Sequence, residues 1–317
     1  MVEEAPQASK NYLFIINPTA GSGLSNEKRQ EVLEIARSLP SSDVKDTKYP
    51  SHATEIAADA IRDGVDTLFV VGGDGTANDA LQMTANKPIK IGIIPTGFFN
   101  VFAREVGIPK NITQAGKVLL EGKVKDIDVG EINDTYFLLA ADFGMDAEKY
   151  MKFHAPGTAR RNSGATTFAK TFAWCALTGL GYTGHRLNIT NGDKNIDENV
   201  LIGAITNTTN YGVLSLNEST VLDDGKLELT YFTGQWAPQI FPQFAGVAMK
   251  RDQIPWLKRD TLSGSLTIHT ELNDEVGITV DGNPLGKFNT LKASVHPSAQ
   301  KMLVPQSAPS RLFQARI

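Results

Sequence analysis

The chain has 317 residues, a formal net charge of −4 and a mean hydropathy of −0.18, and its length favours two domains over a single hydrophobic core. The negative charge gives no support to nucleic-acid binding, and the single cysteine, Cys175, excludes an internal disulfide. The first ten residues lack the apolar core of a signal peptide and no run approaches the ~18 apolar residues of a membrane span, so we expect a cytoplasmic protein that is peripheral to a membrane.

Residues 12–121 alternate short apolar runs with helical patterns, which is typical of parallel α/β units. Between residues 26 and 39, for example, Val32, Ile35, Ala36 and Leu39 repeat at helical spacing. The patterns predict strands at residues 12–17, 44–49, 67–71 and 89–94, and helices at 26–39, 53–62, 77–84, 98–106 and 112–121.

Glycine-bearing loops follow three of these predicted strands, after Ile16, Val71 and Ile94. Ligands of open α/β sheets bind at the loops that leave the carboxyl ends of the strands. We therefore expect a binding site where these three loops meet.

The run Gly72-Gly73-Asp74-Gly75-Thr76 joins an apolar strand to a helix start. Glycines let the backbone pass close to an anion, Thr76 can cap the next helix, and the first amides of that helix point at the ligand. A carboxylate suits such a turn only with a divalent cation between it and the phosphates, so we interpret Asp74 as holding or orienting Mg²⁺ in phosphoryl transfer. The alternative is an ordinary tight turn between strand and helix.

The pattern changes near residue 127, where β-rich segments separated by turn signals replace the alternation. They predict strands at residues 124–132, 136–143, 185–191, 199–207, 226–232, 261–269, 275–281 and 291–296, and helical insertions near 165–180 and 238–249. The predicted fold class is α/β: an N-terminal open α/β domain over residues 1–130, followed by a β-rich, mostly antiparallel second domain over residues 131–296. We expect the active site in the cleft between them, and the sequence leaves open whether residues 297–317 rejoin the first domain.

Five motifs then occur in a fixed order. They are Asn17-Pro18-Thr19-Ala20-Gly21-Ser22-Gly23, the glycine-rich run at 72–76, Pro95-Thr96-Gly97-Phe98-Phe99-Asn100, Asp128-Val129-Gly130 and Asp281-Gly282. Their order and spacing resemble the diacylglycerol kinase catalytic-domain superfamily, which includes bacterial lipid kinases and the sphingosine and ceramide kinases. The resemblance implies a nucleotide-binding first domain, a lipid-substrate second domain, and transfer from Mg-ATP to a hydroxyl of a diacylglycerol-like or sphingoid lipid at a membrane surface.

The resemblance also implies a nucleotide site built from the first three motifs. It assigns to that site Asn17, Gly21, Gly23, Gly72, Gly73, Asp74, Gly75, Thr76, Thr96, Gly97 and Asn100. For the loop at residues 21–23 the alternative is a plain helix-start loop, and for Asn100 it is a helix N-terminal cap.

Two carboxylates are implied as metal ligands. Asp224 resembles the aspartate that holds a structural Mg²⁺ in bacterial members, and Asp128 resembles a carboxylate near the metal network. Oxygen ligands suit this hard cation. A simple hairpin turn at Asp224 and an exposed strand carboxylate at Asp128 are the alternatives.

The implied catalytic residues are Asp74, Asp281 and Asn283, and the last departs from the family, which has a glutamate base there. An amide has no usable basicity near neutral pH, and loss of a general base costs roughly 10²- to 10⁴-fold in rate. Positioning and charge neutralisation dominate phosphoryl transfer, so we expect slow chemistry rather than none. Phe98 is a second departure, because the family has a hydroxyl facing the nucleotide there.

Two further functions stay open beside the lipid kinase. A degenerate member would bind nucleotide or lipid without turnover, and an NAD kinase would share the glycine-rich turn and the two-domain layout. Residues 235–244 carry aromatic side chains, and residues 256–259 join Trp256 to Lys258 and Arg259. Together they suit an interfacial surface, although aromatic residues at helical spacing more often belong to a core. The sequence leaves a homodimer open.

Overall fold

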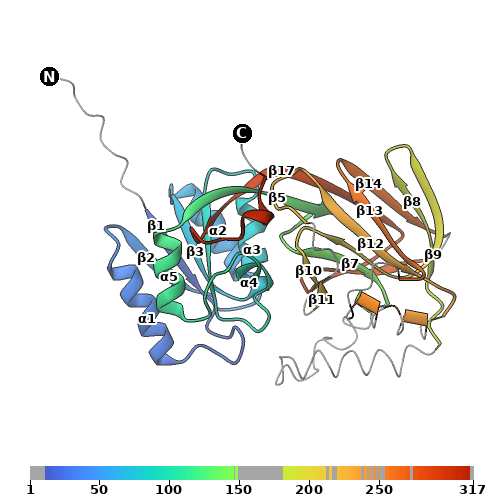
Figure 1. Ribbon diagram of the computed structural model, residues 1–317. Helices are drawn as coiled ribbons and strands as arrows, with labels where there is room; N and C mark the ends of the chain where they lie inside the picture. The colour runs from blue at the N-terminus through green and yellow to red at the C-terminus, as the bar shows by residue number, and fades with distance from the viewer. Residues whose placement is uncertain are drawn as a thin grey trace.

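The computed structural model describes residues 11–145, 147–148, 181–211, 214–215, 220–236, 239–240, 243, 246–247, 249, 254–271 and 274–314. Figure 1 shows two lobes side by side, one with helices around a sheet and one made mainly of strands. Two long strands, β5 (Lys123–Ile132) and β17 (Thr290–Val304), run between the lobes. The predicted α/β class with a β-rich second domain is confirmed.

The first lobe alternates strands and helices along the chain. Its elements are β1 (Tyr12–Ile16), α1 (Asn26–Arg37), β2 (Ser42–Asp46), α2 (His52–Arg62), β3 (Thr67–Gly72), α3 (Asp74–Thr84), β4 (Lys90–Pro95), α4 (Val101–Glu105) and α5 (Ile112–Leu120). The strands pair in parallel in the order β4-β3-β1-β2. All six residues of β3 are buried, which is why this strand reads as a continuous apolar run.

The second lobe is antiparallel throughout the part of the chain that the structure describes. Its strands are β6 (Thr135–Phe137), β7 (Ala140–Gly144), β8 (His185–Asn191), β9 (Lys194–Thr206), β10 (Asn210–Tyr211), β11 (Leu214–Ser215), β12 (Leu227–Thr233), β13 (Leu257–Leu262), β14 (Ser265–Thr270), β15 (Val276–Val280) and β16 (Asn283–Phe288). The 3₁₀ turn η2 (Ser310–Leu312) follows β17.

Strand β17 joins the lobes into one sheet of 15 strands. Its first half pairs with β14, while Lys301 and Met302 pair in parallel with β4 of the first lobe. Strand β5 runs antiparallel to β17 along most of its length. The domain boundaries themselves stay a prediction.

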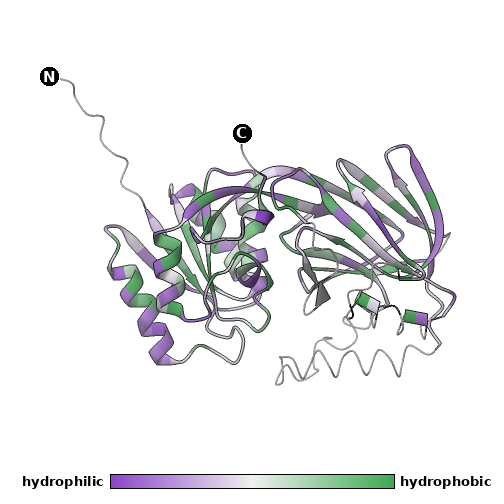
Figure 2. Cartoon of the chain, viewed as in Figure 1, coloured by the Kyte–Doolittle hydropathy of each residue, from purple (hydrophilic) through white to green (hydrophobic). Residues whose placement is uncertain are grey.

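Each lobe has its own apolar core. Figure 2 shows green along the inner strands and purple on the outer faces of helices α1 and α5. The first core includes Phe14, Phe69 and Phe102 and also takes in Val304 and Leu312 from the end of the chain. The second core lies between the strands of the β-rich lobe around Phe143 and Ile278. Burial of these side chains is the main stabilising contribution.

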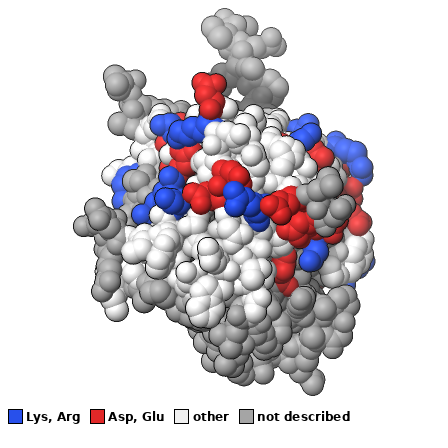
Figure 3. All heavy atoms as spheres, turned by 90° about the vertical axis from the view of Figure 1, so that its right-hand side faces the viewer, with Lys and Arg blue, Asp and Glu red and all other residues white. Residues whose placement is uncertain are grey.

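Charged side chains at the outer end of the β-rich lobe are mixed in sign. Figure 3 shows Lys, Arg, Asp and Glu interspersed in a belt across this face. Two ion pairs of the lobe are Arg186–Asp197 at 2.8 Å and Lys194–Asp260 at 2.5 Å. Exposed pairs of this kind contribute at most about 1 kcal/mol each, so packing holds the lobe together.

Several predicted elements need correction. The segment 136–143 is two strands, β6 and β7, and 261–269 is divided between β13 and β14. Strand β16 was not predicted because it carries Pro284 and Gly286, residues depleted from strands. The helix predicted at 98–106 is only α4, since Asn100 takes a left-handed conformation at φ 45°.

The predicted helical insertions fall on a part of the chain of which little is described. Residues 165–180 lie outside the described residues, and only some of 238–249 are described. Among the residues that are described, no helix is long and apolar enough to cross a bilayer.

Candidate functional site

The glycine-rich run forms the junction between β3 and α3. Helix α3 begins at Asp74, with Gly73 in an extended conformation as its N-cap and no side chain capping its first amides. Thr76 therefore lies inside the helix, and the prediction that it caps the helix was wrong. Thr76 N and Ala77 N donate to Gly73 O, and the positive end of the helix dipole at this glycine-flanked N-terminus suits an anionic ligand.

The first loop is tied to this junction by Asn17. Asn17 Nδ2 donates to Thr76 Oγ1 at 2.9 Å, and Asn17 Oδ1 accepts hydrogen bonds from the backbone N–H and the hydroxyl of Thr19. Asn17 thus acts as a brace between the loop after β1 and the start of α3.

The third loop packs directly on the other two. A Cβ on Gly97 would lie 2.5 Å from Gly73 Cα, and a Cβ on Gly21, whose φ is +61°, would lie 2.5 Å from the carbonyl oxygen of Thr96. These approaches are possible only for glycine. The three loops expected to meet at the carboxyl ends of the strands do meet, and Gly23 at φ +92° belongs to the same turn.

Asn100 closes the third loop on itself. Its Oδ1 accepts from Gly97 N at 3.0 Å and its Nδ2 donates to Gly97 O at 2.8 Å. The side chain is buried and does not cap α4, although the residue occupies the N-cap position. Asn100 therefore shapes the loop, with both ends of its amide already used.

Two neighbours in the third loop face different environments. Thr96 Oγ1 is buried and has no hydrogen-bond partner among the described residues. Phe98 is 41% exposed, so its ring lies at the surface instead of filling the space between the loops. At the position where the family has a hydroxyl, Phe98 is thus exposed, while the Thr96 hydroxyl is buried and unpaired among the described residues.

Asp74 lies between the second and third loops. It is partly buried, and burial raises the pKa of its carboxyl group, against hydrogen bonds from the backbone N–H groups of Val101, Phe102 and Asn100. The carboxylate thus serves as an acceptor for the start of α4. Its predicted contact with Mg²⁺ stays a prediction.

The second lobe contributes the turn between β15 and β16. A Cβ on Gly75 would lie 3.4 Å from Asn283 Nδ2, so the exposed Asn283 side chain stands next to the first turn of α3. Residues more than 200 positions apart in the chain therefore face each other across the junction of the lobes. Asn283 thus lies beside the start of α3, at the junction of the lobes.

Asp281, in the same turn, is differently placed. It is 9% exposed, and its carboxylate accepts four hydrogen bonds, from Asn78 Nδ2 and from the backbone N–H groups of Leu138, Leu139 and Ala140, at 2.8 to 2.9 Å. Burial raises its pKa to about 6 in spite of these donors. Sequence reasoning missed the partner Asn78, although a polar residue at a buried position of a helix is a signal for such a contact.

The predicted metal ligands Asp128 and Asp224 lie near each other beside the lobe junction. Asp128 is fully buried and accepts from Gly225 N at 2.6 Å and Ser298 N at 2.8 Å. Burial raises the pKa of Asp128, and the charge of Asp224 raises it further. Within the described ranges, no group of three or more His, Cys, Asp or Glu side chains is arranged to hold a metal ion.

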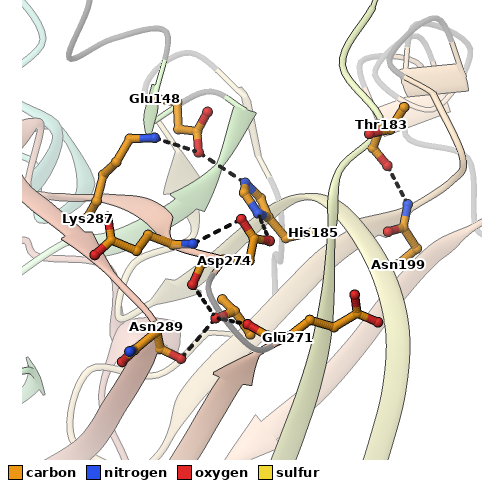
Figure 4. A network of polar contacts seen from close by, with 10 residues as sticks. Glu148, Thr183, His185, Asn199, Glu271, Asp274, Lys287 and Asn289 are labelled. Atoms are coloured by element: carbon orange, nitrogen blue, oxygen red, sulfur yellow. Dashed lines mark hydrogen bonds and ion pairs between the residues drawn. The ribbon is translucent and has the colours of Figure 1, made fainter.

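A further cluster of charged groups lies at the opposite end of β15. Figure 4 shows His185 between two carboxylates, Asp274 at 2.6 Å from Nδ1 and Glu148 at 3.0 Å from Nε2, with Lys287 beside Glu148. Burial by itself lowers the pKa of His185, but the two carboxylates outweigh it and the net pKa is raised. This cluster pins the start of β8 to the start of β15.

The first lobe is similar in sequence to known proteins. Residues 11–132 match the family model of the diacylglycerol kinase catalytic domain. Relatives named diacylglycerol kinase from Staphylococcus saprophyticus and Staphylococcus aureus are each 33% identical over 138 residues, which is 43% of this chain and 45% and 44% of theirs. The alignment thus spans less than half the length of these relatives.

The fold of the whole chain has solved counterparts. A Bacillus anthracis protein provisionally named a diacylglycerol kinase superposes with a TM-score of 0.76 at 20% identity, covering 98% of this chain and all of that one. A second Bacillus anthracis structure, named a diacylglycerol kinase, gives 0.68 at 19% identity over 95% of this chain and 98% of that one. The resemblance expected from the motifs is confirmed.

Proposed function

We propose, on the premise that residues 11–132 form a diacylglycerol kinase catalytic domain, that the protein is an ATP-dependent lipid kinase. It would transfer the γ-phosphate to a hydroxyl of a diacylglycerol-like or sphingoid lipid. The observation that carries this proposal is the approach of Asn283 to Gly75, because it brings a side chain of the second lobe to the helix end where phosphates bind.

The residues of the three loops fit a nucleotide. Gly73 and Gly97 let the second and third loops pack backbone against backbone, the N-terminus of α3 suits phosphate oxygens, and Thr96 Oγ1 is a buried hydroxyl that lacks a partner among the described residues. Asn17 and Asn100 hold the loops in this shape. The chain therefore supplies binding and orientation, which are the main requirements of phosphoryl transfer.

A divalent cation would be held by fewer side chains than the nucleotide. Mg²⁺ is commonly held by one or two carboxylates together with phosphate oxygens, so a cluster of three acidic residues is not needed. Asp74 is the carboxylate nearest the phosphate turn, and Asp128 with Asp224 would hold a separate ion. When bound, the cation would neutralise charge on the phosphates.

An acceptor held in a bilayer requires the protein to act at a membrane surface as a peripheral protein. The lipid hydroxyl would then lie beside Asn283. Since Asn283 cannot take a proton from that hydroxyl, transfer would be slow.

The direct test offers labelled ATP and Mg²⁺ with mixed micelles of candidate lipids. Formation of a phosphorylated lipid supports the proposal, and a variant with Asp74→Asn should lose at least ~10-fold of that activity if Asp74 helps to hold the cation. Absence of product with every diacylglycerol and sphingoid acceptor would contradict it. NAD in the same assay tests the alternative of an NAD kinase.

Asn283 itself favours a second candidate, a module that binds nucleotide or lipid without turnover. The variant Asn283→Glu separates the two functions. A gain of ~100-fold or more in transfer would show a working scaffold that lacks only its base. No gain, with ATP binding intact by calorimetry, would favour the binding module.

A further inference from the structure

Helix α3 touches the second lobe through one polar face. Asn78 and Gln82 lie one turn apart on this face, and both contact residues beyond β5. Asn78 is 5% exposed, so its contacts form inside the protein. The helix that begins at the proposed phosphate site is thus hydrogen-bonded to the other lobe along its length.

The contacts form a closed set. Asn78 Nδ2 donates to Asp281 Oδ2 and to the carbonyl of Tyr136, both at 2.9 Å. Gln82 exchanges two hydrogen bonds with the backbone of Tyr136, donating at 2.8 Å and accepting at 3.0 Å. Asp281 in turn accepts from the amides of residues 138–140. Buried polar networks whose members are all satisfied fix a unique arrangement.

We propose that Asp281 is a positioning residue: through Asn78 it locks helix α3 to the turn at residues 281–283, and the lock sets the spacing between Gly75 and Asn283. Asp281 itself stands at φ 46°, a left-handed conformation that non-glycine residues adopt rarely. Such a conformation persists only where surrounding contacts hold it, and here the four donated hydrogen bonds do so.

The lock explains why Asp281 does not act as the missing base. A general base needs a lone pair that can reach the acceptor hydroxyl. Each carboxylate oxygen of Asp281 already accepts two hydrogen bonds at 2.8 to 2.9 Å, and the group is 9% exposed. The carboxylate therefore holds the turn in place and does not react. This role deepens the proposed function without adding a reacting group.

The lock itself is tested by amide hydrogen exchange, which needs no activity. The variant Asn78→Ala removes the bond to Asp281, and we expect amides 138–140 in the second lobe to exchange about tenfold faster, the effect of one net hydrogen bond. Thr84→Val is the matched control, because Thr84 is buried on the same helix but its hydroxyl donates only to Ala80 O. Unchanged exchange at 138–140 in Asn78→Ala would overturn the lock.

A second variant covers the case in which Asn78→Ala does not fold. Gln82→Ala removes the neighbouring link to Tyr136 and the bond from Gln82 Nε2 to Asn78 Oδ1, and it keeps the bond between Asn78 and Asp281. Faster exchange at residues 135–137 in this variant, with Thr84→Val unchanged, supports the lock. If residues 135–137 exchange no faster in Gln82→Ala than in Thr84→Val, the lock is contradicted.

The kinetic test rests on the proposed function. A displacement of about 1 Å costs roughly 10²-fold in a positioned reaction, so Asn78→Ala and Asp281→Asn should each lower kcat by about 10- to 100-fold while the Kd for Mg-ATP stays within about threefold. The double variant should lose no more than the worse single one, since both remove the same contact. Additive losses, or a rate loss confined to Asp281→Asn with loss of the acid limb of the pH profile, would identify a base instead.

The two tests fail separately. If the protein transfers phosphate to no lipid, the proposed function falls and hydrogen exchange alone decides on the lock. If transfer is found but exchange at residues 138–140 does not respond to Asn78→Ala, the lock falls and the kinase remains.

Discussion

Gly97 shapes the candidate site because it has no side chain. A Cβ there would lie 2.5 Å from Gly73 Cα and 2.8 Å from Asn100 Oδ1, and backbone cannot move away as a flexible side chain would. We expect Gly97→Ala to destabilise the protein by about 1–3 kcal/mol and to weaken ATP binding at least ~10-fold. Urea unfolding and calorimetry measure the two effects.

The control for this variant is Gly264→Ala, because nothing lies within 4 Å of a Cβ at Gly264 and its φ is not in the left-handed region. It should bind ATP as the unaltered protein does. ATP binding that survives Gly97→Ala would show that the third loop does not shape the nucleotide site.

The partly buried carboxyl group of Asp79 should make the free energy of unfolding depend on pH. Burial raises its pKa from 3.8 to about 6, so the folded protein holds a proton that the unfolded chain has released between these values. Stability from this group therefore falls as pH rises from about 4 to 6. We expect Asp79→Asn to be more stable at pH 7 by about 1 kcal/mol, a figure discounted for the partial exposure of the carboxyl group.

Urea unfolding at pH 4.5 and pH 7 checks this expectation. The gain from Asp79→Asn should be larger at pH 7 than at pH 4.5. Asp193→Asn, at an exposed turn position, serves as the control and should change stability by less than ~0.5 kcal/mol at both values. A gain of equal size at both pH values would contradict the assignment.

At the scale of elements, the His185 cluster of Figure 4 joins strands β8 and β15 near residues of β16. In the folded protein the pKa of His185 lies above the ordinary 6.5, because Glu148 and Asp274 favour the charged ring more than burial opposes it. The stabilisation is therefore complete below pH 6.5 and is lost as pH rises through the raised value. We expect His185→Phe to lower stability by about 1–3 kcal/mol at pH 6 and by less at pH 9.

Thermal unfolding across this pH range provides the measurement. His269→Phe is the control, since His269 is exposed and its ring is hydrogen-bonded to the Thr290 hydroxyl, not to a carboxylate. A loss in His185→Phe that does not depend on pH would mean that packing of the ring, not its charge, holds β8 to β15.

The loops of the candidate site could be predicted from the sequence, whereas its contacts could not. Strand-loop-helix patterns and glycines are local signals, so the sequence could predict the junction at Gly73 and the turn at Gly97. The contact of Asn78 with Asp281 joins residues 203 positions apart, and no local pattern encodes which helix meets which turn. The length of helix α4 was overestimated, because hydrophobic spacing does not reveal that Asn100 adopts a left-handed conformation.

Strand pairing in the β-rich lobe was hidden for the same reason. Alternation reveals that a segment such as β15 is a strand, but β15 pairs with β7 from far earlier in the chain and with β16 through the next turn. Only the assembled sheet brings Asn283 to Gly75.

For the whole molecule, the end of β17 is the structural tie between the lobes. Residues Met302, Val304 and Leu312 are buried in the first core, and β17 pairs with β4 and β5. Each buried apolar side chain contributes about 1.5–3 kcal/mol. We expect removal of residues 297–317 to cost at least ~5 kcal/mol, which is comparable to the entire stability of a domain, and to unfold the first lobe.

Circular dichroism and hydrogen exchange at β4 measure this effect. Removal of residues 315–317 alone is the control and should leave the thermal transition unchanged. A chain ending at residue 296 that still protects the β4 amides would show that the first lobe is complete without β17.

The position of β17 has a consequence for how the protein is made in the cell. A ribosome releases the glycine-rich loops long before it makes β17, the strand that pairs with β4 and completes their sheet. During synthesis the nascent first lobe must wait with an open edge at β4, which makes it a candidate client for chaperones that shield unpaired strands.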